Sequence, residues 1–271
     1  MMSAALPARV RDRVALAADA GTGVEVLTLL AADRSPAVRR AVAGRAVPEL
    51  LALLAADRDL RTREAVVTNP VCPAAVLTRM VADPHWSVRG EVPEHPNLDA
   101  EAAEAVLASP HVTLRTLLAG RKGIDAAIER RLAADPAAVV RGSVARFTSV
   151  PDVLAVLVED PETMVRASAA DNPRLTTGQR SRLVRDRRSE VRVAVVNSGG
   201  RFTDEESLLL ARDRSVEVRW WLATSSTVPG HILRILLSDA DEGVVCQAQA
   251  AMRRSHGRNG RKSPTDLAQQ P

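Results

Sequence analysis

The sequence predicts an all-α protein, an α-solenoid of about eight to nine two-helix repeats of 24–27 residues. The first observation is that segments such as DPAAVVRGSV at 135–144 recur along most of the chain. The second is their spacing, because the arginine six residues after each acidic position recurs at intervals of 24 to 27 residues. The eight aligned copies are Arg39, Arg63, Arg89, Arg115, Arg141, Arg166, Arg192 and Arg219. A fixed period of this length is the signature of a stacked repeat array.

Residues 1–32 are expected to form a degenerate N-terminal capping repeat. Apolar residues at helical spacing occur at 10–14 and 24–30, but they make only a blurred copy of the repeat. Terminal units of repeat arrays are commonly atypical, since one face has no neighbour. Arginines at 9, 11 and 13, with no continuous apolar run, argue against a secretory signal.

From Asp33 onward, each unit carries two helix-start signals. The first is an acidic residue, followed by proline in several copies, which predicts an N-cap and a first helical position. The second is an apolar residue followed by proline, aspartate or threonine, as in Val47-Pro48 and Phe202-Thr203. Asn69-Pro70 and similar pairs interrupt the helix between them, because a residue before proline avoids helical geometry. Each unit therefore reads as helix, break, helix, and no alternating β-branched run predicts a strand.

The repeats are expected to occupy residues 33–254, and a disordered basic tail residues 255–271. After Asp239, Val244 and Val245 stand where the arginine is expected, which indicates that the array is ending. Residues 253–271 hold five Lys or Arg and one Asp, 5 − 1 = +4, which equals the formal charge of the whole chain. Residues 1–252 are therefore neutral overall. The polar tail has too little apolar surface to offset the entropy cost of ordering it.

The pattern Leu-Ala-Ala-Asp-x-x-x-x-Val-Arg-x-x-Val-Ala, with helix leaders such as NPVCPAAVL at 69–77, resembles the leucine-rich repeat variant family. The resemblance spans roughly residues 33–250, and the pattern is also similar to HEAT repeats, which share the Asp and Val-Arg positions. It implies a right-handed superhelix that alternates α-helices with short 3-10 helices and has no β-sheet. Founding members carry a cysteine cluster for an iron–sulfur centre; this chain has no such cluster, so no cofactor is expected.

The acidic and arginine columns are interpreted as a structural ladder. In stacked units each acid lies beside the arginine of its own or the adjacent unit, so the columns neutralise each other and fix register. The neutrality of residues 1–252 favours this over a ligand-binding column. The acidic members are Asp33, Asp57, Asp83, Asp135, Asp160, Asp186 and Asp213, with Asp239 after them and Ser109 in one copy.

Three tryptophans are the candidate partner-binding residues. Trp220 and Trp221 are adjacent, and two indoles cannot easily both enter one thin layer, so one is expected in the core and the other partly exposed. Packing against the closing repeat is the alternative to a partner contact. Trp86, in the third repeat, is treated in the same way.

Histidines and cysteines are not expected to form sites. His85 and His111 hold equivalent positions in neighbouring repeats, and layers about 8–10 Å apart are too distant for them to share a zinc ion. Cys72 stands in an apolar column and is expected to be a buried hydrophobe. With Cys246 far away along the array, no disulfide is expected.

The expected function is a non-catalytic interaction scaffold that binds a protein or peptide on its surface. No catalytic constellation or phosphate loop is found, so an enzyme is not expected. The alternative is nucleic-acid binding in the manner of HEAT-like DNA glycosylases, through a concave basic face that includes Arg40, Arg45, Arg121 and Lys122. Weak nucleic-acid affinity is otherwise expected only in the tail. The longest apolar runs are too short to span a membrane, so a cytoplasmic location is expected.

Overall fold

The computed structural model describes residues 6–259, with side chains described for residues 6–254. Within this range it contains nineteen α-helices, one 3-10 helix and no strand. The helices are α1 (Val10–Ala18), α2 (Val24–Ala31), α3 (Pro36–Ala43), α4 (Pro48–Leu54), α5 (Leu60–Val67), α6 (Ala74–Met80), α7 (Trp86–Arg89), η1 (Val92–Glu94), α8 (Ala100–Ala108), α9 (Val112–Gly120), α10 (Ala126–Ala133), α11 (Ala138–Phe147), α12 (Pro151–Leu157), α13 (Thr163–Ala170), α14 (Thr177–Val184), α15 (Ser189–Asn197), α16 (Asp204–Ala211), α17 (Val216–Thr224), α18 (Gly230–Leu236) and α19 (Glu242–Asn259).

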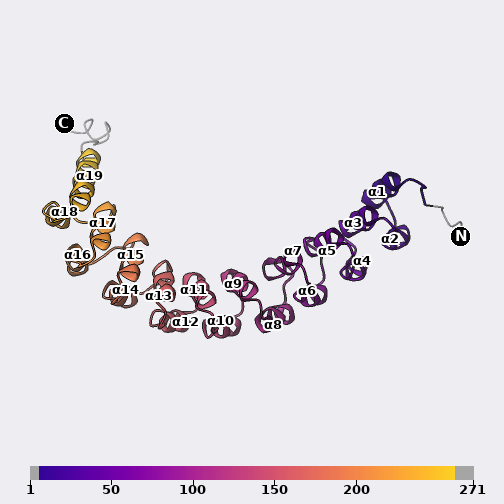
Figure 1. Ribbon diagram of the computed structural model, residues 1–271, viewed down its shortest axis with the longest axis horizontal. Helices are drawn as coiled ribbons and strands as arrows, with labels where there is room; N and C mark the ends of the chain where they lie inside the picture. The colour runs from indigo at the N-terminus through magenta and orange to yellow at the C-terminus, as the bar shows by residue number, and fades with distance from the viewer. Residues whose placement is uncertain (1–5, 260–271) are drawn as a thin grey trace, which may run out of the picture. The chain divides into compact units, whose positions relative to one another are not determined.

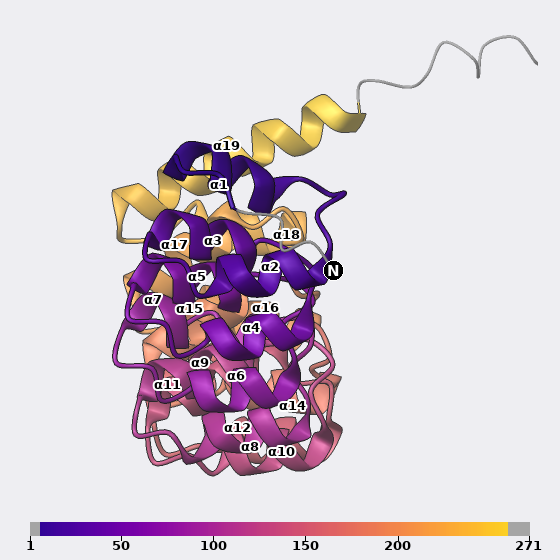
Figure 2. The same cartoon turned by 90° about the vertical axis from the view of Figure 1, so that its right-hand side faces the viewer.

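The helices follow one another as pairs, and the described chain forms two compact units. Helices α1 to α18 make nine consecutive pairs, and α19 follows them (Figure 1). The units are residues 1–140 and 141–271, with the boundary inside α11. Within each unit the first helices of successive pairs pack together, as in α1–α3–α5 and α13–α15–α17. The second helices form the other layer, as in α2–α4 and α14–α16, and Figure 2 shows the two layers of the first unit side by side. The predicted helical repeat solenoid is confirmed.

The core of each layer consists of small aliphatic side chains. Leu27, Leu51 and Leu77 are fully buried at the fourth residue of successive second helices, and Leu132 and Leu157 are fully buried at the seventh residue of α10 and α12. Because helices in contact lie about 8–10 Å apart, valine, alanine and leucine fill such a layer without aromatic residues. Cys72 is completely buried, as predicted, and is a free thiol.

The start of the first helix differs from the expectation. The acidic residue is not the N-cap, because each helix begins three residues after it: α3 begins at Pro36, with Ser35 as its N-cap, after Asp33. Instead the carboxylate accepts the backbone N–H two residues on, 2.8 Å from Ser35 N to Asp33 Oδ1, which shapes the turn that leads into the helix. The same carboxylate also accepts two hydrogen bonds from an arginine, as described below.

The second helices begin largely as predicted. Pro48 and Pro151 occupy the first helical positions of α4 and α12. Asp99 caps α8, and Thr176 forms a full capping box with Gln179 at the start of α14. The short 3-10 helices implied by the family resemblance are mostly α-helices here, and η1 is the one 3-10 helix in the described range.

The two ends of the array also differ in detail from the expected boundaries. Residues 10–31 form a complete helix pair, so the degenerate first repeat keeps the architecture of the others. Helix α19 continues to Asn259, five residues beyond the expected end of the array at 254. The rest of the predicted basic tail, residues 260–271, lies outside the described residues.

Candidate binding grooves and the aspartate–arginine ladder

Eight bidentate ion pairs join successive repeats within the described chain. In every pair the arginine Nε lies 2.6–2.7 Å from one carboxylate oxygen of the acid in the next repeat. The pairs are Arg13–Asp33, Arg39–Asp57, Arg63–Asp83, Arg115–Asp135, Arg141–Asp160, Arg166–Asp186, Arg192–Asp213 and Arg219–Asp239. The columns therefore pair between adjacent repeats, which was one of the two arrangements left open.

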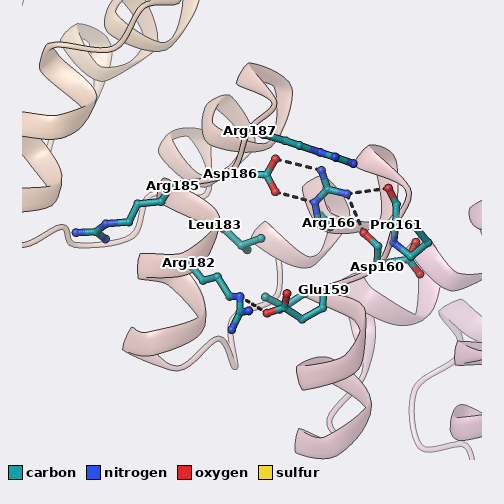
Figure 3. Close-up of a pocket in the computed structure, with 10 residues that line it drawn as sticks. Glu159, Asp160, Pro161, Arg166, Arg182, Leu183, Arg185, Asp186 and Arg187 are labelled. Atoms are coloured by element: carbon teal, nitrogen blue, oxygen red, sulfur yellow. Dashed lines mark hydrogen bonds and ion pairs between the residues drawn. The ribbon is translucent and has the colours of Figure 1, made fainter.

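Each ladder arginine is also tied to its own repeat. The third guanidinium nitrogen of Arg166 donates to the backbone oxygen of Asp160, 2.8 Å away, while the other two hold Asp186 (Figure 3). Arg39, Arg63 and Arg192 bond the carbonyl six residues earlier in the same manner. One guanidinium thus fixes the turn of its own repeat and the turn of the next.

The pairing lowers the pKa of five ladder carboxyls, those of Asp33, Asp57, Asp160, Asp186 and Asp239. For Asp57, Asp160 and Asp186, burial alone raises the pKa, but the hydrogen bonds from the arginine and from the backbone N–H outweigh it, so the pKa lies below its ordinary value. For Asp33 and Asp239 the arginine hydrogen bond is the largest influence, and the pKa is again lowered. These carboxyls are therefore ionised in the folded protein at neutral pH.

Arg13 is a ladder residue that the sequence interpretation missed. It lies 26 residues before Arg39 and holds Asp33 at 2.6 Å. The repeat alignment relied on an acid six residues before the arginine, with Ser109 before Arg115 as the one accepted exception, and Pro7 stands at that position before Arg13. Because the partner acid belongs to the following repeat, that requirement was the wrong one. An acid twenty residues after the arginine would have identified it.

One step of the ladder is empty. Ser109 replaces the acid that would face Arg89, and Arg89 Nε is buried with no hydrogen-bond acceptor in the described structure. Arg89 was predicted to belong to the structural ladder, and that expectation is corrected at this position, because serine has no carboxylate to offer.

A second polar column joins the repeats at the breaks between helices. Asn69 Nδ2 donates to the backbone oxygens of Ala43 and Arg45 in the preceding repeat, at 2.9 and 3.0 Å. Asn172 is 2 % exposed and makes the same two contacts one repeat back. His95 occupies this column as well, with Nε2 3.0 Å from Asn69 O, and is buried. The residues before proline therefore satisfy carbonyl groups at the helix ends.

Two grooves in the second compact unit occupy equivalent places in consecutive repeats. Their volumes are about 330 and 370 Å³. Every residue lining the second has a counterpart 26 or 27 positions earlier in the first: Val158/Val184, Glu159/Arg185, Asp160/Asp186, Arg166/Arg192, Arg182/Leu209, Arg185/Arg212, Asp186/Asp213 and Arg187/Arg214. We call these grooves 1 and 2. A groove that recurs with the repeat suits a ligand that is itself extended.

The lining of these grooves has an excess of positive charge. The ladder arginines neutralise the aspartates that line the grooves, and other arginines of the lining remain. In groove 1, Arg166 and Asp186 satisfy each other, and Glu159 pairs with Arg182 (Figure 3). Arg187 extends beside the Arg166–Asp186 pair and is exposed, and its guanidinium has no partner in the described structure. The segment 174–192 contains seven arginines and two acids, with charge +5 (7 − 2). The overall neutrality of residues 1–252 concealed this local excess.

Groove 2 also has an apolar edge. Leu209 lines groove 2 and is 43 % exposed. It stands one repeat after Arg182 on the outward side of the second helix, and Val156, 65 % exposed, precedes Arg182 by one repeat. Val156 and Leu209 thus occupy the same repeat position, with Arg182 at that position in the repeat between them.

All three tryptophans are at least partly exposed. Trp220 and Trp221 meet edge to face, with centroids 4.9 Å apart, and both are partly buried, so the expected division into one core and one exposed ring is not found. Trp220 also lies beside Gly243 of α19, where an added Cβ would be 3.7 Å from Cδ1 of the ring. Trp86 is 46 % exposed in the first unit, and its ring lies 5.9 Å from the Arg89 guanidinium carbon.

The remaining sequence candidates have local roles. His85 caps α7 and lies 2.7 Å from the Ser87 hydroxyl, while His111 is the exposed N-cap of α9. No three or more His, Cys, Asp or Glu side chains in the described range are placed to hold a metal ion. Burial raises the pKa of the Cys72 thiol to about 11, which makes it a poor nucleophile.

Two of the four basic residues assigned to a nucleic-acid face have structural hydrogen bonds. Arg45 donates to the backbone oxygens of Ala17 and Ala20, and Arg121 to that of Pro93, each in the preceding repeat. Arg40 and Lys122 are exposed. The expected contiguous basic face therefore loses two of its members to the repeat packing.

Comparison with known proteins supports the architecture. No protein-family model and no curated protein matches the sequence. Among solved structures, a leucine-rich repeat variant described as having a novel repetitive structural motif aligns with a TM-score of 0.54 and 25% identity, covering 73% of this chain and 81% of that one. YibA of Escherichia coli aligns over 94% of this chain and all of that one, with a TM-score of 0.36 and 16% identity. No helix in the described range is long and apolar enough to cross a membrane.

The ladder, the helix pairs and this structural similarity lead to one assignment. The resemblance to leucine-rich repeat variants is confirmed in the structure, and the chain is a helical repeat protein with the fold of a leucine-rich repeat variant.

Proposed function

We propose that the protein is a non-catalytic scaffold that binds an extended, acidic peptide segment of a partner protein along grooves 1 and 2. The observation that carries this proposal is that the groove recurs in consecutive repeats at eight equivalent positions, six of which hold the same residue type, while Arg185 and Leu209 of groove 2 stand in place of Glu159 and Arg182 of groove 1. A repeated groove presents the same contacts at a fixed interval, and this is how solenoid proteins bind extended ligands.

The groove spacing sets the expected spacing of the ligand. Helices in contact lie about 8–10 Å apart, and an extended chain spans at most about 3.3–3.6 Å per residue. One repeat therefore corresponds to about three peptide residues. Acidic side chains at every third position would meet Arg187 in groove 1 and Arg214 in groove 2, while Leu209 contacts an apolar side chain between them.

Nucleic-acid binding is the second candidate, and the observation in its favour is the arginine excess of residues 174–192. Phosphate groups attract the same guanidinium groups. The apolar edge formed by Leu209 favours a peptide, because a phosphate backbone gains nothing from an exposed leucine. Any nucleic-acid affinity of the basic tail is a separate, salt-sensitive contribution.

The test measures fluorescence anisotropy of a labelled, capped peptide with glutamate at every third position and leucine between. A matched peptide with glutamine for glutamate and a duplex DNA serve as comparison ligands. Arg187→Gln with Arg214→Gln removes two groove charges, and Arg40→Gln with Lys122→Gln removes two exposed charges elsewhere as the control. A charge-assisted hydrogen bond is worth about 1.5–3 kcal/mol, so loss of one contact corresponds to about tenfold in affinity.

The expected result is that the groove variant loses at least about tenfold in affinity for the glutamate peptide, while the control variant keeps it. Wild-type protein that binds the glutamine peptide equally well would overturn the proposal. Tighter binding of duplex DNA than of the glutamate peptide, lost in the groove variant and kept in the control variant, would favour the nucleic-acid alternative.

A further inference from the structure

The empty step of the ladder, at Arg89 and Ser109 in the first unit, presents an arginine prepared to bind a carboxylate. Eight other steps in the described chain show what this guanidinium is shaped to hold. In each of them Nε and Nη2 grip the two oxygens of one carboxylate, as in Arg63 with Asp83 at 2.7 and 3.3 Å and Arg115 with Asp135 at 2.6 and 3.2 Å. These two steps lie on either side of the empty one.

The guanidinium of Arg89 is anchored as in the complete steps. Its Nη1 donates to the backbone oxygens of Asp83 and Pro84, at 3.2 and 2.8 Å. Arg166 makes the same two contacts, to Asp160 and Pro161. Since this anchor fixes one end of the planar group, the edge bearing Nε and Nη2 is directed toward the position of the missing acid.

Ser109 keeps one role of the acid and loses the other. Its hydroxyl accepts the backbone N–H of His111 at 3.3 Å, as the ladder aspartates do two residues on. Serine thus preserves the turn, while its short side chain supplies no partner to Arg89. Neither Nε nor Nη2 of Arg89 bonds to any described residue, and Nε is buried. A buried donor without an acceptor is destabilising because it has lost its water partner, and an incoming carboxylate would supply the missing acceptor.

Trp86 provides an adjoining apolar contact. Its ring lies 5.9 Å from the guanidinium carbon and rests against Gly90, where an added Cβ would lie 2.9 Å from Cζ2 of the ring. The ring is nevertheless 46 % exposed. Tryptophan and arginine are among the residue types enriched at the energetic centres of protein interfaces.

We propose that Arg89 binds a carboxylate supplied from outside the chain, the acidic side chain of a peptide segment whose neighbouring apolar residue packs on Trp86. The carboxylate takes the place that Asp83 and Asp135 occupy in the flanking steps, with its two oxygens on Nε and Nη2. This site lies in the first unit and does not depend on grooves 1 and 2.

The experiment follows the Nε–Hε NMR resonances of the arginines in the full chain, with the Arg89 signal assigned by its loss in Arg89→Met. Wild-type protein is titrated with acetate and with acetamide, its neutral isostere, at constant ionic strength. The peptide arm uses a capped Leu-Glu-Leu tripeptide and its Leu-Gln-Leu counterpart. Ser109→Asp fills the empty step from within, and Asp57→Ser opens a second empty step that faces Arg39.

Acetate and the glutamate tripeptide are expected to shift the Arg89 resonance saturably, whereas acetamide and the glutamine tripeptide leave it in place. Saturation by acetate but not by the tripeptide would show a site for small carboxylates and overturn the peptide part of the proposal. In Ser109→Asp the Arg89 resonance should join those of the paired arginines, and its response to acetate should be lost. In Asp57→Ser, the Arg39 resonance should gain the response.

The proposal is overturned if acetate leaves the Arg89 resonance unmoved, or if it shifts every arginine alike. It is equally overturned if Ser109→Asp responds to acetate as wild type does. The Arg89→Met melting temperature, measured with and without acetate, is an independent readout, since acetate should raise the melting temperature of wild type and not of this variant.

Discussion

Asp57→Ser should convert a complete ladder step into a copy of the natural empty one, and its cost measures what a step contributes. Arg39 is 6 % exposed and holds Asp57 through Nε–Oδ2 and Nη2–Oδ1 contacts of 2.6 and 2.8 Å. Removing one partner of a buried ion pair costs about 3–5 kcal/mol. The turn should survive, because a serine hydroxyl can still accept the Asp59 N–H that Asp57 now accepts at 2.8 Å.

The pH dependence of the stability of Asp57→Ser tests whether the ionised Asp57 carboxylate is the source of the lost stability. The pKa of Asp57 in the folded protein is below its ordinary value of 3.8. A depressed carboxyl pKa contributes stability that is fully present above the unfolded value and is lost as the pH falls through the folded one. The stability difference between wild type and Asp57→Ser should therefore be constant near neutral pH and shrink below about pH 4.

Urea unfolding followed by circular dichroism, from pH 7 to pH 3, measures both effects. Asp12→Ser is the control, because Asp12 pairs with Arg11 at the exposed surface and such pairs contribute about 0–1 kcal/mol. Arg39→Met combined with Asp57→Ser should cost less than Asp57→Ser alone, since no buried charge is then left without a partner. A cost below about 1 kcal/mol for Asp57→Ser, or one that does not change with pH, would refute the ladder as the source of register stability.

Two further predictions concern buried groups. Asn172→Ala leaves the backbone oxygens of Ala145 and Thr148 without this donor and should cost about 1–3 kcal/mol in urea unfolding; an unchanged midpoint would contradict the structural role of this column. At pH 8 a thiol reagent should modify exposed Cys246 in the folded protein and reach Cys72 only after unfolding, because burial raises the Cys72 pKa to about 11. Rapid modification of both thiols in the native protein would contradict that burial.

The sequence predicted the repeat well because period and helix chemistry are local. The interval between arginines located the helix pairs, and Asp99 and Thr176 capped the helices that they were expected to cap. The ladder was also predicted, but its direction was left open, since sequence spacing alone does not distinguish a partner in the same repeat from one in the next. Arg13 was missed for that reason.

The grooves were not predicted, because their linings combine residues from different repeats. Arg187 and Glu159 line one groove although 28 positions separate them. The available signal was the density of arginine in residues 174–192, which averaging the charge over 252 residues removed. Trp220 and Trp221 show the same limit: their adjacency suggested opposite environments, whereas α17 places both rings partly at the surface and in contact with each other.

The ladder also decides which arginines are available to a partner. An arginine within a complete step has its positive charge balanced by an aspartate and its donors engaged, so it adds little to any binding surface. The charges that remain for recognition belong to arginines outside the ladder, such as Arg187 and Arg214 in the second unit, and to Arg89, whose acid is missing. On the proposal above, an arginine that lacks its aspartate is free to bind a carboxylate from outside the chain while it keeps its anchor to the turn of its own repeat. A helical repeat array can acquire a new carboxylate site by a single substitution of this kind, and replacing Ser109 with aspartate should reverse it.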